Sequence, residues 1–334
     1  MAVTLKGEQN SAYGRLLRHS GPAVPGWPGA AGSVVTEPLL SRGDTLGVVA
    51  PGFGVRRTAL EAGLRRLRSL GYRVLLGDHV YARNGYLAGS DEERARDLNG
   101  MLENPDVRAV WFARGGYGSA RLLDRVRWRA LARSSKTLIG YSDVTALFAA
   151  ALRQGVGVCL YGPVVTELGE PKAFHLPSLR RVLRGEPLTL KISRRQVLQP
   201  GKAAGRLLGG NLTVLVHLLG TRYAPDLRGA ILFIEDAGES AYRLDRLLQH
   251  LSMSGSLKDV TGVLVGSFDS VGRHSFLRDR PILDLLRETF LPLGVPVVMG
   301  LKAGHLPGKR TLPIGGLARL DTMAGKLEVK VRPR

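Results

Sequence analysis

The sequence has little cysteine and no long apolar run. Its 334 residues include one cysteine, Cys159, which excludes an internal disulfide, a cysteine-based zinc cluster and a CxxC redox pair. No apolar stretch approaches the ~20 residues that span a bilayer. No charged segment followed by an apolar core indicates a secretory signal, which predicts a cytoplasmic protein. No HExxH motif and no histidine pair at metal-ligand spacing are present, so we expect no metal. We also expect no cofactor, and no membrane association because the apolar runs are short.

Positive charge, by contrast, is abundant. The 48 Lys+Arg outnumber the 28 Asp+Glu, so the formal net charge is +20. Clustered cations often neutralise nucleic-acid phosphates. Here they are mostly arginines spread over separate predicted helices, and no basic segment has interleaved aromatics. A solvated surface explains this pattern, so we expect no nucleic-acid partner.

The chain length and pattern predict two α/β domains after an N-terminal extension. Residues 21–32 are rich in proline and glycine, and we expect residues 1–43 to form a flexible extension. Over residues 44–167, strands and helices alternate, which predicts a Rossmann-like parallel sheet with helices on both faces. The strands are expected at 44–51, 72–76, 107–113, 137–143 and 156–162, and the helices at 57–70, 90–102, from Ser119 through Leu123, and at 144–153.

The second half of the chain reads differently. The prolines and charges of residues 168–200 indicate a linker, and residues 201–334 predict a smaller C-terminal α/β domain. In that domain we expect a loop entering a helix at 207–221, strands at 230–236, 262–268 and 296–300, helices at 240–251 and 281–290, and a paired-strand ending.

A serine follows the third predicted strand. Ligands of open parallel sheets bind outside the carboxyl ends of the strands, so the residues just after each strand are candidates. The Gly-rich segment 114–119 predicts a sharp turn that places the Ser119 hydroxyl at a helix N-terminus. This geometry resembles the strand-turn-helix of a GxSxG elbow. The alternative is that Ser119 only caps the helix.

A serine nucleophile needs a histidine base that is held by an acid. Of the seven histidines, His305 follows a strand in the constrained segment 302–308, although an exposed loop histidine is the alternative. Glu235 ends an apolar strand, where a carboxylate without a partner would be poorly solvated. Asp236 and Glu239 have instead the D-x-x-E spacing of a helix cap. We therefore expect Glu235 to be the acid.

Six blocks of the sequence resemble the LD-carboxypeptidases, the muramoyltetrapeptide carboxypeptidases of peptidase family S66. The resemblance runs from about residue 44 to residue 325 in the order of that family. It implies a Ser-Glu-His triad, which falls on Ser119, Glu235 and His305. The blocks are residues 87–99, 113–123, 139–147, 207–215, 232–248 and 304–315.

The resemblance also implies the reaction, in which a peptidoglycan-derived tetrapeptide loses its terminal D-alanine during cell-wall recycling. It further implies a site between two domains and a homodimer. In the mechanism, His305 takes the proton of the serine and Glu235 holds the imidazole. We expect the oxyanion to be met by backbone N–H groups of Ala120 and of the helix start at Gly89. The expected substrate-binding residues are Arg114, Gly116, Ser142 and Lys302.

Three alternatives remain open at this point. A sister branch of the family hydrolyses microcin C-type aminoacyl-nucleotides, and its nucleophile loop usually has Asn before the Ser, whereas Gly118 stands here. A dehydrogenase would suit Gly52, Gly54 and Asp78, but the third glycine of the fingerprint is missing. A wall-peptide or nucleic-acid binding protein without activity is the third.

Overall fold

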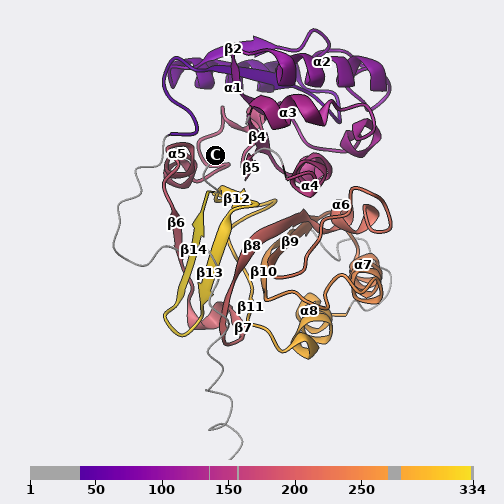
Figure 1. The fold of residues 1–334 in the computed structure, drawn as a ribbon, viewed down its shortest axis with the longest axis vertical. Coiled ribbons are helices and arrows are strands. Elements are labelled where there is room, and N and C mark those ends of the chain that lie inside the picture. Colours follow the sequence, from indigo (N-terminus) through magenta and orange to yellow (C-terminus); the bar gives the residue numbers. More distant parts are fainter. Residues whose placement is uncertain (1–37, 135, 156–157, 270–279, 332–334) are drawn as a thin grey trace, which may run out of the picture. The chain divides into compact units, whose positions relative to one another are not determined.

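The computed structural model describes residues 38–134, 136–155, 158–269 and 280–331 (Figure 1). Its first sheet has six strands in the order β12-β5-β4-β3-β1-β2. Five of them are parallel, and β12 pairs antiparallel with β5. Their bounds are β1 (Thr45–Val49), β2 (Arg73–Leu76), β3 (Val107–Phe112), β4 (Thr137–Gly140), β5 (Val158–Tyr161) and β12 (Leu312–Ile314).

Helices cover both faces of this sheet, as predicted. The strand order reverses at β1, which has β2 on one side and β3 on the other. Because crossovers between parallel strands are right-handed, the first helix lies on the opposite face from the others. A capping box of Ser90 and Glu93 begins α2. The helices are α1 (Arg57–Ser69), α2 (Asp91–Glu103), α3 (Trp128–Ser134) and α4 (Thr145–Arg153).

The second sheet has eight strands in the order β6-β14-β13-β8-β9-β10-β11-β7. Strands β8 to β11 are parallel, and the outer strands are antiparallel. The bounds are β6 (Leu188–Lys191), β7 (Val197–Gln199), β8 (Lys202–Asn211), β9 (Ala230–Ala237), β10 (Gly262–Asp269), β11 (Val297–Val298), β13 (Leu317–Asp321) and β14 (Lys326–Lys330).

Two predicted segments have more structure than expected. Residues 168–200, predicted as a linker, contain helix α5 (Leu176–Leu183) and supply β6 and β7, the two edge strands of the second sheet. Residues 207–211, predicted as a loop, are the end of β8, which leads directly into α6 (Leu212–His217). The pairing of these strands with distant partners stabilises them, and local sequence patterns do not reveal such pairing.

The second sheet buries one side against helices. Leucines of α7 (Ala241–Met253) and α8 (Ile282–Phe290) form a buried cluster with apolar residues of β9 and β10. Figure 1 shows α7 and α8 together beside these strands. The amphipathic spacing of Leu244, Leu248 and Leu251 accounts for this packing, because residues three and four apart share one helix face.

The packed part of the chain begins earlier than predicted. We had placed the start of the first domain at residue 44. Leu39 and Leu40 are each 4% exposed, and the Leu40 amide donates a hydrogen bond to the Leu183 carbonyl (3.1 Å). Residues 1–37 of the predicted extension lie outside the described residues. Within the described ranges, no helix combines the length and apolarity needed to cross a membrane.

Candidate active site

Ser142 stands in a tight turn between a strand and a helix. It follows β4 after the extended residue Tyr141, and it opens a 3-10 turn (Ser142–Val144) that leads into α4. Its φ of 69° is positive, and among the described residues it is the one non-glycine residue with such a value. Left-handed backbone at a residue with a Cβ is strained by about 1–2 kcal/mol. Strain of this kind is concentrated at functional sites.

Gly115 makes room for this turn. A Cβ at Gly115 would lie 2.9 Å from the Cβ of Ser142 and 3.2 Å from its Oγ. Real side chains do not come this close, so the loop after β3 approaches Ser142 only because residue 115 is glycine.

His305 reaches Ser142 because of how the chain runs between the two sheets. It lies in the segment between β11, in the second sheet, and β12, which adds to the first sheet beside β5. Strand β5 in turn pairs with β4, the strand that ends before Ser142. The segment that carries His305 is therefore brought to the end of β4 by strand pairing.

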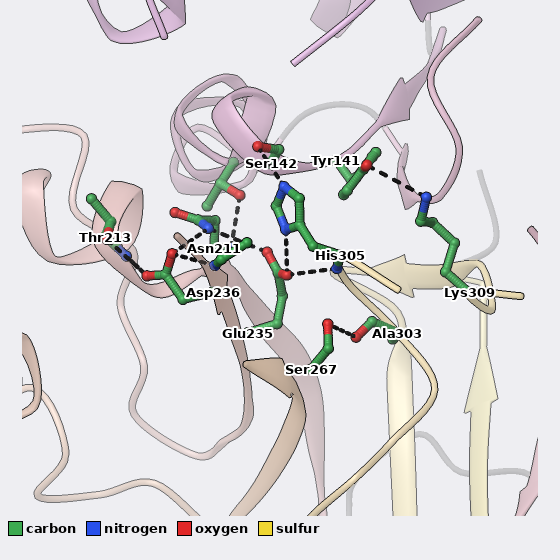
Figure 2. Close-up of polar contacts among 12 residues, drawn as sticks. Tyr141, Ser142, Asn211, Thr213, Glu235, Asp236, Ser267, Ala303, His305 and Lys309 are labelled. Carbon is green, nitrogen blue, oxygen red and sulfur yellow. Dashed lines mark hydrogen bonds and ion pairs between the residues drawn. The ribbon is translucent and has the colours of Figure 1, made fainter. Parts of the chain in front are cut away.

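Ser142, His305 and Glu235 form a chain of hydrogen bonds (Figure 2). The Nε2 atom of His305 lies 3.1 Å from Ser142 Oγ, and its Nδ1 atom lies 2.7 Å from Glu235 Oε2. A carboxylate can only accept a hydrogen bond, so Nδ1 carries the proton and Nε2 presents a lone pair to the serine hydroxyl. This arrangement can take a proton from the serine.

The pKa of His305 is raised above its usual value. Burial of the ring opposes the charged form, but the hydrogen bond and the negative charge of Glu235 outweigh this effect. Glu235 itself is fully buried, and the backbone N–H of His305 donates a second hydrogen bond to Oε2 (3.0 Å). A buried carboxylate of this kind holds the imidazole in a fixed orientation and favours its protonated form.

Glu235 has two further donors at its other oxygen. The Tyr161 hydroxyl donates to Oε1 (2.7 Å), and the Asn211 amide nitrogen lies 3.3 Å from the same atom. Asn211 also begins α6, where its side chain accepts from the Val214 N–H. With four donors the buried carboxylate is satisfied, which confirms the expectation that Glu235 needs partners.

The prediction that His305 pairs with Ser119 is wrong. The side chain of Ser119 is buried, and its Oγ has no hydrogen-bond partner in the described part of the structure. Instead, the Ser119 N–H donates to Asp143 Oδ2 (2.9 Å). Gly118, with a φ of 133°, turns the chain so that Ser119 begins a four-residue 3-10 turn (Ser119–Leu122) in place of the expected helix. Ser119 thus supports the turn at Ser142 from behind.

The predicted oxyanion donors also lie outside the site formed by Ser142 and His305. Ala120 is exposed in the turn after Ser119, and Gly89 packs against the Glu93 carboxylate. The N–H of Ser90 is already bonded to Glu93 Oε2 (2.8 Å), so the helix start at Gly89 is occupied by its own capping box. Neither Ala120 nor Gly89 lines the cavity at Ser142.

A cavity of about 500 Å³ opens at Ser142 and His305. Three of the predicted substrate-binding residues line it, namely Arg114, Gly116 and Ser142. Lys302 is exposed and does not line it, which contradicts our expectation. The charged residues at the wall of the cavity are the cations Arg56 and Arg114 and the acids Glu167 and Glu170.

A buried ion pair supports one wall of the cavity. The Nζ atom of Lys309 lies 2.6 Å from Glu167 Oε1, and the Tyr141 hydroxyl donates to the same oxygen (2.8 Å). The ring of Tyr141 lies 4.8 Å from the ring of His305, measured between centroids. Figure 2 shows Lys309 beside Tyr141 on the far side of His305 from Asn211. This wall restricts where the imidazole can lie.

Asp236 does not cap the helix that follows it, contrary to our prediction. Its Oδ2 accepts from the N–H (2.8 Å) and the hydroxyl (2.7 Å) of Thr213, at the start of α6. The residue at the N-terminus of α7 is Ser240, and its side chain makes no capping bond. The D-x-x-E spacing was therefore misleading, because β9 continues through Asp236 to Ala237.

Sequence reasoning missed Tyr161, Asn211 and Lys309, and it gave Ser142 only a binding role. A signal for Ser142 was present: Gly140-Tyr141-Ser142 stands at the end of an apolar strand and precedes a helix, as in the first half of a GxSxG elbow. The other three carry no comparable local signal. Among the described residues, no cluster of three His, Cys, Asp or Glu side chains is suited to a metal ion.

Comparison with known proteins identifies the family. Residues 46–162 match the LD-carboxypeptidase N-terminal domain, and residues 204–320 match the LD-carboxypeptidase C-terminal domain. A putative carboxypeptidase of Synechocystis is 39% identical, over 87% of this chain and 96% of that protein. The murein tetrapeptide carboxypeptidase of Pseudomonas aeruginosa is 36% identical, over 82% of this chain and 92% of that protein.

A solved structure and a more distant relative are also similar to this chain. The muramoyltetrapeptide carboxypeptidase of Oxalobacter formigenes superimposes with a TM-score of 0.77 at 34% identity, over 86% of this chain and 98% of that one. The microcin C7 self-immunity protein of Escherichia coli is 27% identical, over 86% of this chain and 94% of that protein. The two matched domains include strands of both sheets and the segment that carries His305. The chain belongs to the LD-carboxypeptidase family, peptidase family S66.

Proposed function

We propose that the protein is a serine LD-carboxypeptidase that releases the terminal D-alanine from peptidoglycan-derived tetrapeptides. The observation that carries this proposal is the hydrogen-bonded chain of Ser142, His305 and Glu235 at the mouth of a cavity. The relatives named murein tetrapeptide carboxypeptidase and muramoyltetrapeptide carboxypeptidase support the substrate.

Ser142 is the nucleophile in this mechanism, in place of Ser119. Its Oγ attacks the carbonyl carbon of the L,D peptide bond while its proton passes to Nε2 of His305. Glu235 stabilises the imidazolium that forms. The Nε2 proton then passes to the nitrogen of the leaving D-alanine as the C–N bond breaks. Water, deprotonated by the same nitrogen, hydrolyses the acyl-enzyme and restores the serine.

The oxyanion needs backbone donors near Ser142. The N–H of Asp143 is one candidate, because it belongs to the residue after the nucleophile. The N–H of Gly115 is the second, because this residue approaches Ser142 Oγ more closely than a side chain would permit. These two groups replace Ala120 and Gly89. Loss of one such donor typically reduces the rate by about 10²–10³-fold.

The cations of the cavity suit the free carboxylates of the substrate. Arg114 donates to the Gly54 carbonyl (3.0 Å), which holds its guanidinium near the ring of Phe53 at the cavity wall. Arg56 is exposed at the same wall. An arginine binds a carboxylate through paired N–H groups, so both are candidates for the substrate carboxylates.

Hydrolysis of a microcin C-type aminoacyl-nucleotide is the second candidate. The same three residues could cleave its acyl bond, and the chain resembles the microcin C7 self-immunity protein over most of its length. The identity is lower, however, at 27% against 36% for the murein tetrapeptide carboxypeptidase. The tetrapeptide is therefore the better-supported substrate.

Release of D-alanine from purified tetrapeptide tests the proposal. We expect the Ser142→Ala variant to lose about 10⁴-fold or more in kcat/KM. Ser119→Ala is the matched control, since it removes a buried serine hydroxyl close by, and its activity should stay within about threefold of the unmodified enzyme.

Other outcomes would redirect the assignment. Activity that is lost in Ser119→Ala and kept in Ser142→Ala would return the nucleophile to Ser119. A folded protein that leaves tetrapeptide intact but cleaves an aminoacyl sulfamoyl nucleoside would be the second enzyme. A folded protein that cleaves neither would be a binding protein. The expectations of a homodimer and a cytoplasmic location, which rest on the family resemblance and the missing secretory signal, are tested by sedimentation and cell fractionation.

A further inference from the structure

The hydroxyl of Tyr161 contacts two parts of the site at once. It lies 3.2 Å from the backbone nitrogen of Ser142 and 2.7 Å from Oε1 of Glu235. Tyr161 is 1% exposed and does not line the cavity at Ser142. It is thus placed behind the reacting groups, where it can act on the site without touching a substrate.

The directions of the two hydrogen bonds follow from the chemistry of the groups. A phenol has one proton, and Glu235 can only accept, so the Tyr161 O–H donates to the carboxylate. The phenol oxygen then accepts the hydrogen bond of the Ser142 N–H. Burial, together with the negative charge of Glu235, raises the pKa of Tyr161, which keeps the phenol protonated as a donor.

Three aromatic rings hold the phenol in place. The Tyr161 ring lies 5.4 Å from Phe233, 6.0 Å from Tyr141 and 6.5 Å from Phe148, measured between centroids, with interplanar angles of 71–81°. Edge-to-face contacts of this kind are favourable between aromatic rings. The hydroxyl therefore has little freedom to leave its two partners.

The bridge joins residues from the two sheets. Tyr161 ends β5 and is in register with Gly140 of β4, two residues before Ser142, whereas Glu235 lies on β9 of the second sheet. One hydroxyl thus connects the strained turn at Ser142 with the acid that holds His305. Asn211 supports the same carboxylate oxygen from a longer distance of 3.3 Å.

We propose that Tyr161 is a positioning residue for the reaction, which fixes the backbone turn at Ser142 and holds the Glu235 carboxylate through a hydrogen bond to Oε1. This inference rests on the proposed hydrolase function. The hydrogen bond to Oε1 disperses the negative charge of Glu235, so less of that charge acts on His305. The hydrogen bond from the Ser142 N–H restrains a left-handed turn that would otherwise relax.

Removal of the hydroxyl alone has a distinctive expected result. In Tyr161→Phe, Oε1 of Glu235 loses its closest donor, so more of the negative charge of the carboxylate acts on His305 and the pKa of His305 rises. We expect the acid limb of the kcat/KM profile to move upward by about half a pH unit or more. We also expect kcat to fall about 10–100-fold with KM within about threefold, because Tyr161 does not line the cavity.

A matched control removes a similar hydrogen bond elsewhere. The hydroxyl of Tyr81 also donates to a carboxylate, Glu61 Oε1, and neither residue lines the cavity. Tyr81→Phe should leave kcat, KM and the acid limb unchanged. A second variant should shift the acid limb in the opposite direction. 3-Fluorotyrosine at position 161 is a stronger hydrogen-bond donor, so it should lower the pKa of His305 and move the acid limb of kcat/KM to lower pH.

The outcomes separate this inference from the proposed function. NMR titration of the His305 ring reports its pKa without activity, so the inference is testable even if tetrapeptide is not cleaved. An unchanged acid limb and His305 pKa in Tyr161→Phe would overturn the inference, whatever happens to kcat, because a purely structural hydroxyl predicts that result. The proposed function fails separately, if the folded unmodified protein releases no D-alanine.

Discussion

Ser142 Oγ lies 3.1 Å from His305 Nε2, although 163 positions separate the two residues in the chain. The contact is made by topology. Strand β12, which follows His305, returns to the first sheet and pairs with β5. Strand β5 is the neighbour of β4, the strand that ends before Ser142. A base from one half of the chain is thereby placed on the hydroxyl of a serine from the other half.

Gly115 should tolerate no side chain. A Cβ there would lie 2.9 Å from the Cβ of Ser142, so Gly115→Ala must displace the serine turn or the loop after β3. We expect kcat to fall by about 10-fold or more, since a misplacement of about 1 Å at a reacting group can cost 100-fold.

Gly100→Ala is the matched control for that substitution. Gly100 is an exposed residue of α2, and a Cβ there would meet nothing within 4 Å. This change should keep full activity and stabilise the protein by about 0.5–1 kcal/mol, because alanine is the better helix former. Steady-state kinetics and chemical denaturation of both variants check the pair. Full activity in Gly115→Ala would contradict the close approach at Ser142.

The activity should fall as the pH drops through the raised pKa of His305. His305 must be neutral to accept the serine proton, and its pKa lies above the usual 6.5 because the pull of Glu235 outweighs burial. Protonation as the pH falls through that raised pKa removes the base. We therefore expect the acid limb of kcat/KM above pH 6.5.

The glutamate can be tested as the source of this shift. Glu235→Gln removes the negative charge and should lower the pKa of His305 relative to the unmodified protein, as measured by NMR titration of the ring. An acid limb at or below pH 6.5, or a His305 pKa that does not fall in the variant, would contradict this account.

Arg56 should contribute to substrate binding more than to the chemical step. It is exposed at the cavity wall, and no ion pair within the described ranges engages it. Arg56→Ala should raise KM for tetrapeptide about 3–30-fold with kcat nearly unchanged, and the difference should shrink at high salt because of screening. Arg65→Ala removes the same charge from an exposed position of α1 outside the cavity. An equal rise of KM in both variants would indicate a general charge effect.

The buried pair of Lys309 and Glu167 should matter for stability. The Lys309 side chain is 5% exposed and that of Glu167 is 23% exposed, so the removal of one partner leaves a poorly solvated charge. We expect Lys309→Met to lower the free energy of unfolding by about 2–4 kcal/mol.

The double variant Lys309→Met/Glu167→Gln should recover part of that loss, because neither charge remains. Chemical denaturation of the single and double variants measures the coupling between the two residues. An additive double variant would show that the ion pair does not contribute to stability.

Local patterns predicted most of the first sheet and two of the three residues in the hydrogen-bonded chain. The alternation of apolar strands and amphipathic helices placed the parallel strands of this sheet, although the predicted fourth strand ran on to residue 143, whereas β4 ends at Gly140. Glu235 was chosen because it ends an apolar strand, and His305 because it follows one. Ser119 was preferred to Ser142 because it follows the Gly-rich segment 114–119, which predicts a sharp turn. The glycines, however, serve another purpose, since Gly115 makes room for Ser142 and Gly118 turns Ser119 inward.

The amino-acid sequence by itself determined the family, the strand-helix order and the segments from which functional side chains would come. Only the tertiary structure decided which serine faces His305, and it placed Tyr161 between Ser142 and Glu235. The physical reason is that hydrophobic periodicity and turn residues act over a few positions. The pairing of β12 with β5 and the left-handed turn at Ser142 depend instead on contacts between residues far apart in the chain.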